Sequence, residues 1–176
     1  IMYFYDYVKG GRNLRLMRVI TGIAKGCKLS SPEGLDVRPT LDRVKELTGK
    51  DFAFYPYDIR DKENMSNVFE EHKIDACIHF AGLKAVGESV SVPLKYYENN
   101  ITGTVILLQV MAEAGVKKIV FSSSATVYGL TDKVPLTEDL PTSATNPYGR
   151  TKLMIEEILK DLYVSDNEWA ISILRY

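Results

Sequence analysis

The sequence has few of the residues that build metal sites and disulfide frameworks. Among its 176 residues there are two cysteines, Cys27 and Cys77, and two histidines, His72 and His79. The cysteines form no C-x-x-C pair, which argues against a zinc knuckle and a disulfide scaffold and favours a reduced, cytoplasmic setting. His79 lies inside an apolar run with no second ligand beside it. We therefore expect a buried, hydrogen-bonded imidazole and no metal site.

The sequence also lacks an excess of charge and any long apolar run. Lysine and arginine number 22 against 23 aspartates and glutamates, so the net charge is -1. This balance predicts no general attraction to nucleic acid or to an anionic membrane. No apolar stretch approaches the ~18 residues that a membrane span needs. Hydrophobic residues make up 45% of the chain, which predicts a soluble globular protein.

From residue 51 onward, apolar runs alternate with helical patterns. Strands are predicted over 52–56, 74–80, 116–121 and 169–174, and helices over 62–72, 93–115 and 147–162. Asn146 and Pro147 form a helix-start signal, and Gly115 is placed to end the preceding helix. A Ser- and Pro-rich loop of about two dozen residues joins the strand predicted over 116–121 to Asn146, and it is longer than such connections usually are. The alternation predicts an α/β fold with a parallel sheet, whose compact apolar strands are buried on both faces.

Residues 1–46 do not follow this alternation. The first sixteen are aromatic and basic without the apolar core of a secretion signal. They are predicted to form a poorly ordered extension or to come from outside the original gene. Residues 17–46 hold a short strand, two Pro turns and a polar helix start. We place a boundary near residue 46, between a foreign or poorly packed segment (1–46) and the main domain (47–176).

The pattern with the most chemical content is Tyr148-Gly-Arg-Thr-Lys152. Positions i and i+4 share one helix face, so phenol and ammonium should point the same way. A free tyrosine has a pKa near ~10, and a neighbouring cation is expected to lower it. The bare spacing has little specificity, because Tyr5 and Lys9 match it too. A solvated helix face therefore stays the alternative.

The position of this pattern favours a function. The helix follows a strand that ends in Ser122-Ser123-Ser124. Ligands of parallel sheets bind beyond the carboxyl ends of strands, where a serine can share the proton of a reacting hydroxyl. Ordinary turn chemistry is the alternative for these serines.

Several motifs agree in order and spacing with one known family. FSSSATVYG followed by NPYGRTK, with HFAGLKAVGES upstream, resembles the UDP-galactose 4-epimerase family of extended short-chain dehydrogenases, and so do YDIRD, YYENNITGT and ISILRY. The resemblance runs from about Leu47 to Tyr176. It implies interconversion of UDP-glucose and UDP-galactose by NAD-mediated hydride transfer at C4, in cytoplasmic galactose metabolism. It allows a homodimer in the intact family and leaves open a preference for N-acetyl sugars.

The resemblance also assigns roles to matching residues. Tyr148 would be the acid–base residue, Lys152 would hold the nicotinamide ribose and tune Tyr148, and Ser124 would bind the sugar hydroxyl. Asp58 and Ile59 would lie against the adenine. The other residues implied to contact the dinucleotide, with Lys84 and Tyr148 also contacting the substrate, are Phe80, Ala81, Gly82, Leu83, Lys84 and Asn99. For each of these, packing or turn geometry is the alternative.

The serine loop separates two related activities. Sugar 4,6-dehydratases resemble this family but carry an Asp-Glu pair just after the small hydroxyl residue, because elimination of water needs an acid and a base there. This chain has Ala125-Thr126 instead. The loop therefore favours epimerisation.

The resemblance implies parts that this sequence lacks. The family begins with a strand, a G-x-x-G-x-x-G turn and a helix, then a second strand ending in an acid. Here residues 17–22 imitate only the first strand. The family also continues beyond Tyr176 into a sugar-binding domain. We therefore expect a partial Rossmann-type doubly wound parallel sheet without the first βαβ unit and the C-terminal substrate domain, with unpaired strand edges and weak or no activity.

Residues 17–46 resemble a second family, the 16S rRNA guanine-N2 methyltransferases. The matching features are MRVITG, Lys25-Gly26, PEGL and RPTLDRVKE. The Asn-Pro-Pro-Tyr loop and the Gly-rich cofactor turn of a methyltransferase are absent. We therefore expect a chimera, for which the alternatives to an epimerase are a non-catalytic α/β remnant or an RNA binder.

Overall fold

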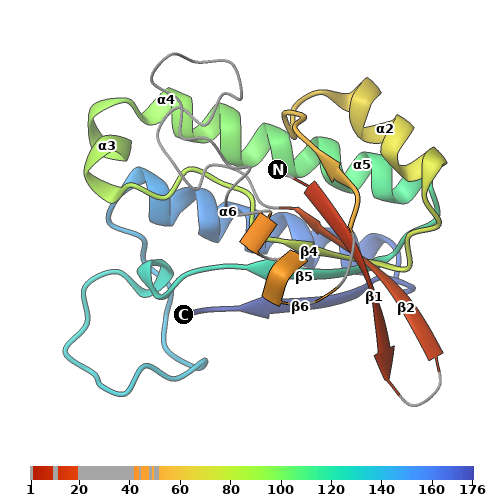
Figure 1. The fold of residues 1–176 in the computed structure, drawn as a ribbon. Coiled ribbons are helices and arrows are strands. Elements are labelled where there is room, and N and C mark those ends of the chain that lie inside the picture. The colour runs from red at the N-terminus through yellow and green to blue at the C-terminus, as the bar shows by residue number, and fades with distance from the viewer. Residues whose placement is uncertain (1, 10–11, 20–41, 44, 48, 50–51) are drawn as a thin grey trace.

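The computed structural model describes residues 2–9, 12–19, 42–43, 45–47, 49 and 52–176. These residues form one sheet in the order β3-β1-β2-β4-β5-β6 (Figure 1). The strands are β1 (Met2–Lys9), β2 (Arg12–Val19), β3 (Phe54–Tyr55), β4 (Ala76–His79), β5 (Lys118–Ser122) and β6 (Ala170–Leu174). The helices are α2 (Lys62–Glu71), α3 (Val86–Ser91), α4 (Pro93–Tyr96), the π-helix η1 (Tyr97–Thr102), α5 (Gly103–Glu113), the 3-10 helix η2 (Ala125–Tyr128) and α6 (Pro147–Ser165).

Every described strand except β1 runs in one direction. Strands β2, β4, β5 and β6 pair in parallel, while β1 pairs antiparallel with β2 and with β3. The predicted α/β fold with a parallel, Rossmann-type sheet is therefore confirmed. The expected boundary near residue 46 lies among residues of which only some are described, and it stays a prediction.

An N-terminal hairpin occupies the middle of the sheet. Strands β1 and β2, red in Figure 1, lie where we expected an extension outside the fold. Leu16 to Val19 of β2 pair with the whole of β4, so the segment around residue 18 fills the place of the missing first strand and β4 has no unpaired edge on this side. The physical reason is that the unpaired N–H and C=O groups at a sheet edge can hydrogen-bond the backbone of any extended segment, independent of its sequence.

The described helices cover one face of the sheet. Connections β3-α2-β4, β4-α5-β5 and β5-α6-β6 all step the same way along the sheet, and right-handed crossovers then place these helices on one side (Figure 1). In β4, Cys77 and His79 are buried, while Ala76 and Ile78 are half-buried, and β5 alternates likewise. The prediction of strands buried on both faces is therefore wrong for β4 and β5. In a doubly wound sheet, the helix of the first βαβ unit, which we expect this chain to lack, would cover the second face of the sheet.

The predicted long helix is present, with one turn of unexpected geometry. Elements α4, η1 and α5 follow one another without a break over 93–113. Gly115 adopts φ +70, and Val116 N donates to Met111 O at 2.8 Å, which is the glycine end that we predicted. The π-helical turn η1 was not predicted, and neither were α3 and η2. Such turns are frequent at functional sites.

Helix α6 begins as its sequence predicts. The Asn146 side chain accepts a hydrogen bond from Gly149 N at 2.8 Å, and Pro147 occupies the first turn. In the part of the chain that the structure describes, no helix is both long and apolar enough to cross a membrane.

Candidate active site

The three residues predicted to carry the chemistry come together beyond the carboxyl end of β5. Tyr148 and Lys152 lie one turn apart on α6, with Lys152 Nζ 6.0 Å from the centre of the Tyr148 ring. The Ser124 hydroxyl hydrogen-bonds the Tyr148 phenol. Ser124 Oγ also accepts from Thr126 N at 3.2 Å and from Thr126 Oγ1 at 2.9 Å. Both of its lone pairs are then used, so Ser124 is the donor to Tyr148.

The Tyr148 phenol does not have the lowered pKa that we expected from its lysine neighbour. Burial raises its pKa, and the hydrogen bond from Ser124 opposes that rise only in part. Lys152 Nζ lies over the ring and donates to the backbone oxygen of Ser122 at 2.6 Å. The ammonium is therefore not directed at the phenol oxygen, and the phenol stays protonated at neutral pH.

Lys152 is an unusually buried ammonium. Its exposed fraction is 5%, and its Nζ lies 4.8 Å from the centre of the Phe121 ring. Burial lowers its pKa to about 8. An amine with three donor hydrogens reaches one acceptor, Ser122 O, among the described residues. Two donors therefore remain for a ligand.

We predict that Lys152 makes stability depend on pH between about 8 and 10. Its pKa in the folded chain, about 8, is below the ordinary 10.5, so the unfolded chain binds more protons in this window. Folded stability should therefore rise with pH by up to about 1.4 kcal/mol per pH unit. Urea unfolding of the wild type and of Lys152→Met at several pH values measures this contribution as a difference. Parallel pH profiles for the two proteins would contradict the prediction.

The turn after β4 is held by Asn100, which sequence reasoning missed. Asn100 is 3% exposed; its Oδ1 accepts from Leu83 N at 2.7 Å and its Nδ2 donates to Leu83 O at 3.0 Å. Gly82 has φ +154, and a Cβ there would lie 3.3 Å from Asn100 Oδ1. The neighbouring Asn99, which we had selected, is half-buried and donates to Asn100 Oδ1 at 2.9 Å. The second of two consecutive amides, next to Asn99, was the available signal.

Asn100 also ties this turn to α6. Its Nδ2 donates to Thr151 Oγ1 at 3.1 Å, and Thr151 Oγ1 donates to Tyr148 O at 2.7 Å. The turn over 82–84 and the first turn of α6 therefore share one buried polar network. That network fixes the position of the Tyr148 backbone relative to the end of β4.

His79 is the buried, hydrogen-bonded imidazole that we predicted. Its Nε2 lies 2.8 Å from Thr104 Oγ1, whose own proton goes to Asn100 O at 2.6 Å. His79 Nε2 must then be the donor. Burial lowers its pKa to about 3, so the ring is neutral. Among the described residues, no cluster of three or more histidine, cysteine, aspartate or glutamate side chains is placed to hold a metal ion.

The two residues predicted to lie against the adenine follow β3 and contact neighbouring parts of the chain. Asp58 is exposed and accepts from Arg60 Nη2 at 2.8 Å, and this bond holds the pKa of the Asp58 carboxyl below its ordinary value. Ile59 is 2% exposed and lies against Gly103, where a Cβ would sit 2.5 Å from Ile59 Cγ2. Gly103 therefore packs closely against Ile59. Of the remaining predicted residues, the structure shows Ala81 buried, Phe80 and Leu83 half-buried and Lys84 exposed.

Comparison with known families gives one match over most of the chain. The sequence model of the family described as GDP-mannose 4,6 dehydratase matches residues 24–176. This range contains every residue of the cluster around Tyr148.

Similar curated proteins are UDP-glucose 4-epimerases. The protein from Bacillus subtilis (strain 168) is 64% identical over 136 residues, which cover 77% of this chain and 40% of the relative. UDP-glucose 4-epimerase 2 from Arabidopsis thaliana is 60% identical over 140 residues, covering 78% of this chain and 40% of the relative. This chain therefore spans 40% of the length of these relatives.

Similar solved structures carry the same name. The UDP-glucose 4-epimerase from Bifidobacterium longum, in complex with NAD+ and UDP, is 52% identical with a TM-score of 0.77, over 83% of this chain and 42% of that one. The enzyme from Stenotrophomonas maltophila, with bound NAD and formylated UDP-arabinopyranose, is 45% identical with a TM-score of 0.77, over 84% of this chain and 43% of that one.

Proposed function

This chain belongs to the family described as GDP-mannose 4,6 dehydratase, and from that premise we propose that it carries part of the active site of a UDP-glucose 4-epimerase. The observation that carries the proposal is the cluster of Ser124, Tyr148 and Lys152, in which a buried ammonium and a hydroxyl donor flank one phenol. The identity of the relatives supports the choice of UDP-glucose and UDP-galactose as substrates.

The described residues fit the nicotinamide half of NAD. Lys152 keeps two donor hydrogens, which suit the two hydroxyls of a ribose. Gly82 has no side chain, which lets the turn after β4 pack closely against the Asn100 amide. We propose that Phe80, Ala81, Leu83, Lys84 and Asn99 complete this side, with Asp58 and the backbone of Ile59 on the adenine side.

The residues of the cluster divide the proton chemistry between them. NAD, when bound, would supply a hydride acceptor that can return the hydride to either face of the sugar carbon. The Tyr148 phenolate would take the proton of the C4 hydroxyl and later give it back. Ser124, which donates to Tyr148 in this structure, would turn its hydroxyl toward the sugar hydroxyl and orient it. The phenol is protonated in this structure, so Lys152 would favour the phenolate only together with the positive charge of bound oxidised NAD.

A sugar 4,6-dehydratase is the second candidate, because the matching family bears that description. Dehydration needs an acid and a base beside the serine. Here the position is filled by Ala125 and Thr126, and Thr126 Oγ1 is engaged as a donor to Ser124. Neither side chain can exchange a proton at neutral pH, which supports epimerisation.

The proposal also covers the setting of the enzyme. We propose a cytoplasmic location, which the low cysteine content supports, and a homodimer for the intact family. The ligands named for the similar structures support a UDP-sugar as partner. The balanced charge supports neither nucleic acid nor membrane. Residues 17–46 lie largely outside the described residues, so their resemblance to an rRNA methyltransferase, and the chimera it implies, stay predictions.

NAD binding tests the proposed function directly. We expect isothermal titration of the chain with NAD to show saturable binding, and Lys152→Met to weaken it by about tenfold or more because charge-assisted bonds to the ribose are lost. Lys160→Met, on an exposed part of the same helix, is the matched control and should bind like the wild type. An absence of saturable binding at millimolar NAD would remove the proposed function from this chain.

A further inference from the structure

We propose that Glu156 is a positioning residue of this active site, which acts through Ser123 to hold Ser124 against Tyr148; the inference rests on the proposed function. Glu156 is a fully buried carboxylate, with an exposed fraction of 0%. The proton chemistry described above does not use it. A buried charge at this position calls for a reason, because burying an ion is costly unless it is paired.

The first argument is the register between α6 and the serine run. Tyr148, Lys152 and Glu156 are each four residues apart and therefore share one face of α6. Each of them contacts a different serine of the run at the end of β5. Lys152 binds the Ser122 backbone, Glu156 accepts from the Ser123 hydroxyl, and Tyr148 accepts from the Ser124 hydroxyl. One helix face thus contacts all three consecutive serines, and Glu156 holds the middle one.

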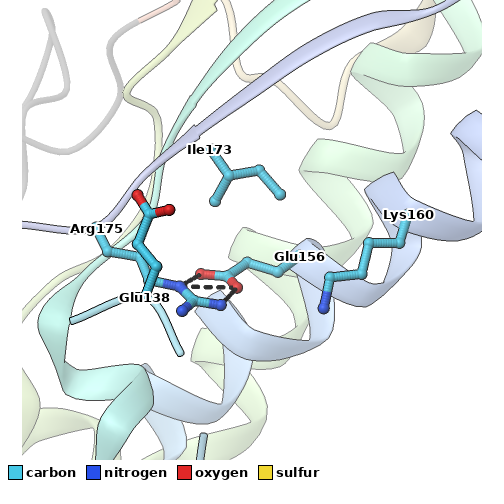
Figure 2. Close-up of a pocket in the computed structure, with 5 residues that line it drawn as sticks. All are labelled: Glu138, Glu156, Lys160, Ile173 and Arg175. Atoms are coloured by element: carbon cyan, nitrogen blue, oxygen red, sulfur yellow. Dashed lines mark hydrogen bonds and ion pairs between the residues drawn. The ribbon is translucent and has the colours of Figure 1, made fainter. Parts of the chain in front are cut away.

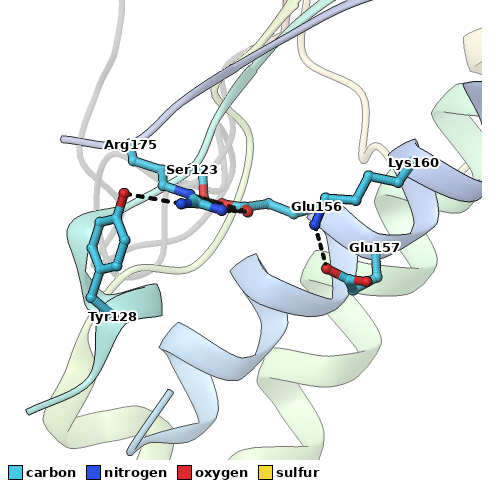
Figure 3. Close-up of polar contacts among 6 residues, drawn as sticks. All are labelled: Ser123, Tyr128, Glu156, Glu157, Lys160 and Arg175. Carbon is cyan, nitrogen blue, oxygen red and sulfur yellow. Dashed lines mark hydrogen bonds and ion pairs between the residues drawn. The ribbon is translucent and has the colours of Figure 1, made fainter. Parts of the chain in front are cut away.

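The second argument is the tie from Glu156 to the end of β6 (Figure 3). Arg175 donates to Glu156 Oε2 from its Nη2 at 2.6 Å and to Oε1 from its Nε at 3.1 Å. Its Nη1 donates to the Tyr128 hydroxyl of η2 at 2.9 Å. A planar guanidinium that forks onto a carboxylate fixes orientation as well as distance. Glu156 therefore joins α6, the end of β5, the end of β6 and η2.

The third argument is that the backbone around Arg175 flanks Ser124 on both sides. Ser123 N donates to Leu174 O at 2.8 Å, and Ala125 N donates to Tyr176 O at 3.2 Å. The ion pair holds Arg175, which lies between these two carbonyl groups in the chain. Fixing Arg175 consequently fixes the two backbone bonds that bracket Ser124, and so the direction of the Ser124 hydroxyl.

The cavity beside this pair does not suggest a ligand of its own. It has a volume of about 230 Å³ and is lined by Glu138, Glu156, Lys160, Ile173 and Arg175 (Figure 2). Two acids and two bases give it no net charge, and Arg175 is already bound to Glu156 while Lys160 pairs with Glu157 at 2.7 Å. The cavity leaves 19% of the Arg175 side chain exposed but none of the Glu156 side chain. A positioning role accounts for Glu156 better than a second binding site does.

The test reads the hydrogen bond to Tyr148 by carbon-13 NMR of the ring carbon that bears the phenol oxygen. Tyrosine labelled at that carbon is incorporated into the whole chain, and the Tyr148 signal is identified by its loss in Tyr148→Phe. Ser124→Ala removes the bond directly and calibrates the displacement of the signal. We expect Glu156→Gln at pH 8 to displace the signal in the same direction, because glutamine offers Arg175 one acceptor and one clashing donor. Global destabilisation alone would not move the signal of the folded protein.

Two further variants make the outcome decisive. Ser123→Ala keeps the ion pair and the fold but cuts the link to β5, so it should displace the Tyr148 signal as Glu156→Gln does. Glu157→Gln changes the adjacent, exposed glutamate, which pairs with Lys160, and should leave the signal in place. A wild-type signal in folded Glu156→Gln, or in Ser123→Ala, overturns the proposal. The measurement needs no cofactor, so a chain that fails to bind NAD would refute the proposed function separately.

Discussion

Replacing Tyr148 by Phe should lower epimerase turnover by a factor on the order of 10² or more. The change keeps the ring, which is half-buried beside Ser124 and Lys152, and removes only the hydroxyl that exchanges the proton. Without it, no group in the cluster can accept the proton of the sugar hydroxyl, because Ser124 is a far weaker base. The assay would follow UDP-galactose conversion in a full-length protein in which residues 52–176 replace the matching segment of the Bacillus subtilis relative.

The matched control for this substitution lies on the same helix. Tyr163 is exposed near the end of α6, so Tyr163→Phe should turn over at the rate of the unchanged protein. NAD binding by Tyr148→Phe should persist, because Lys152 still offers its donors. Equal turnover with phenylalanine at position 148 would remove Tyr148 from the mechanism.

The second large effect concerns stability. Arg175→Met should lower the free energy of unfolding by about 3 to 5 kcal/mol, because it leaves the Glu156 carboxylate buried with the Ser123 hydroxyl as its remaining partner among the described residues. Arg175 also bonds Tyr128, so η2 should loosen as well. Urea unfolding at neutral pH, followed by the fluorescence of the buried Trp169, measures the loss.

Two further variants test whether the stability loss comes from burial of the Glu156–Arg175 ion pair. Arg60 forms ion pairs with Asp58 and Glu98 at the surface, and Arg60→Met should cost less than about 1 kcal/mol. The double variant Glu156→Met with Arg175→Met removes both charges and should recover much of the stability lost by Arg175→Met alone. A double variant as unstable as the single one would show that packing, and not the unpaired charge, causes the loss.

The sequence predicted the parts of the site that depend on local geometry. A spacing of four residues places Tyr148 and Lys152 on one helix face wherever the helix lies, and Asn146 marks where that helix begins. The carboxyl end of a parallel strand places Ser124 on the ligand side of the sheet. These predictions needed only spacing and chain order, and the structure brings the three side chains together.

The parts that the sequence did not predict depend on partners far along the chain. Asn100 acts on Leu83 and Thr151, and Glu156 acts on Arg175, so neither can be recognised without the fold. The π-helical turn at 97–102 has no distinctive spacing of apolar residues. The place of β1 and β2 in the sheet does not follow from sequence motifs. A strand pairs through its backbone, and this pairing requires no Gly-rich turn after the strand.

The reversed polarity of β1 has a consequence for how the adenosine ribose could be recognised. In dinucleotide-binding sheets, the strand beside the first one ends in an acid that binds the ribose hydroxyls. In this chain the neighbouring strand is β1, which runs antiparallel to β2. Met2, at the amino end of β1, therefore pairs with Val19, at the carboxyl end of β2. The strand therefore turns its starting end, not its final residue, to the ligand edge. A carboxylate for the ribose would have to come from another element, such as the stretch after β3 that holds Asp58.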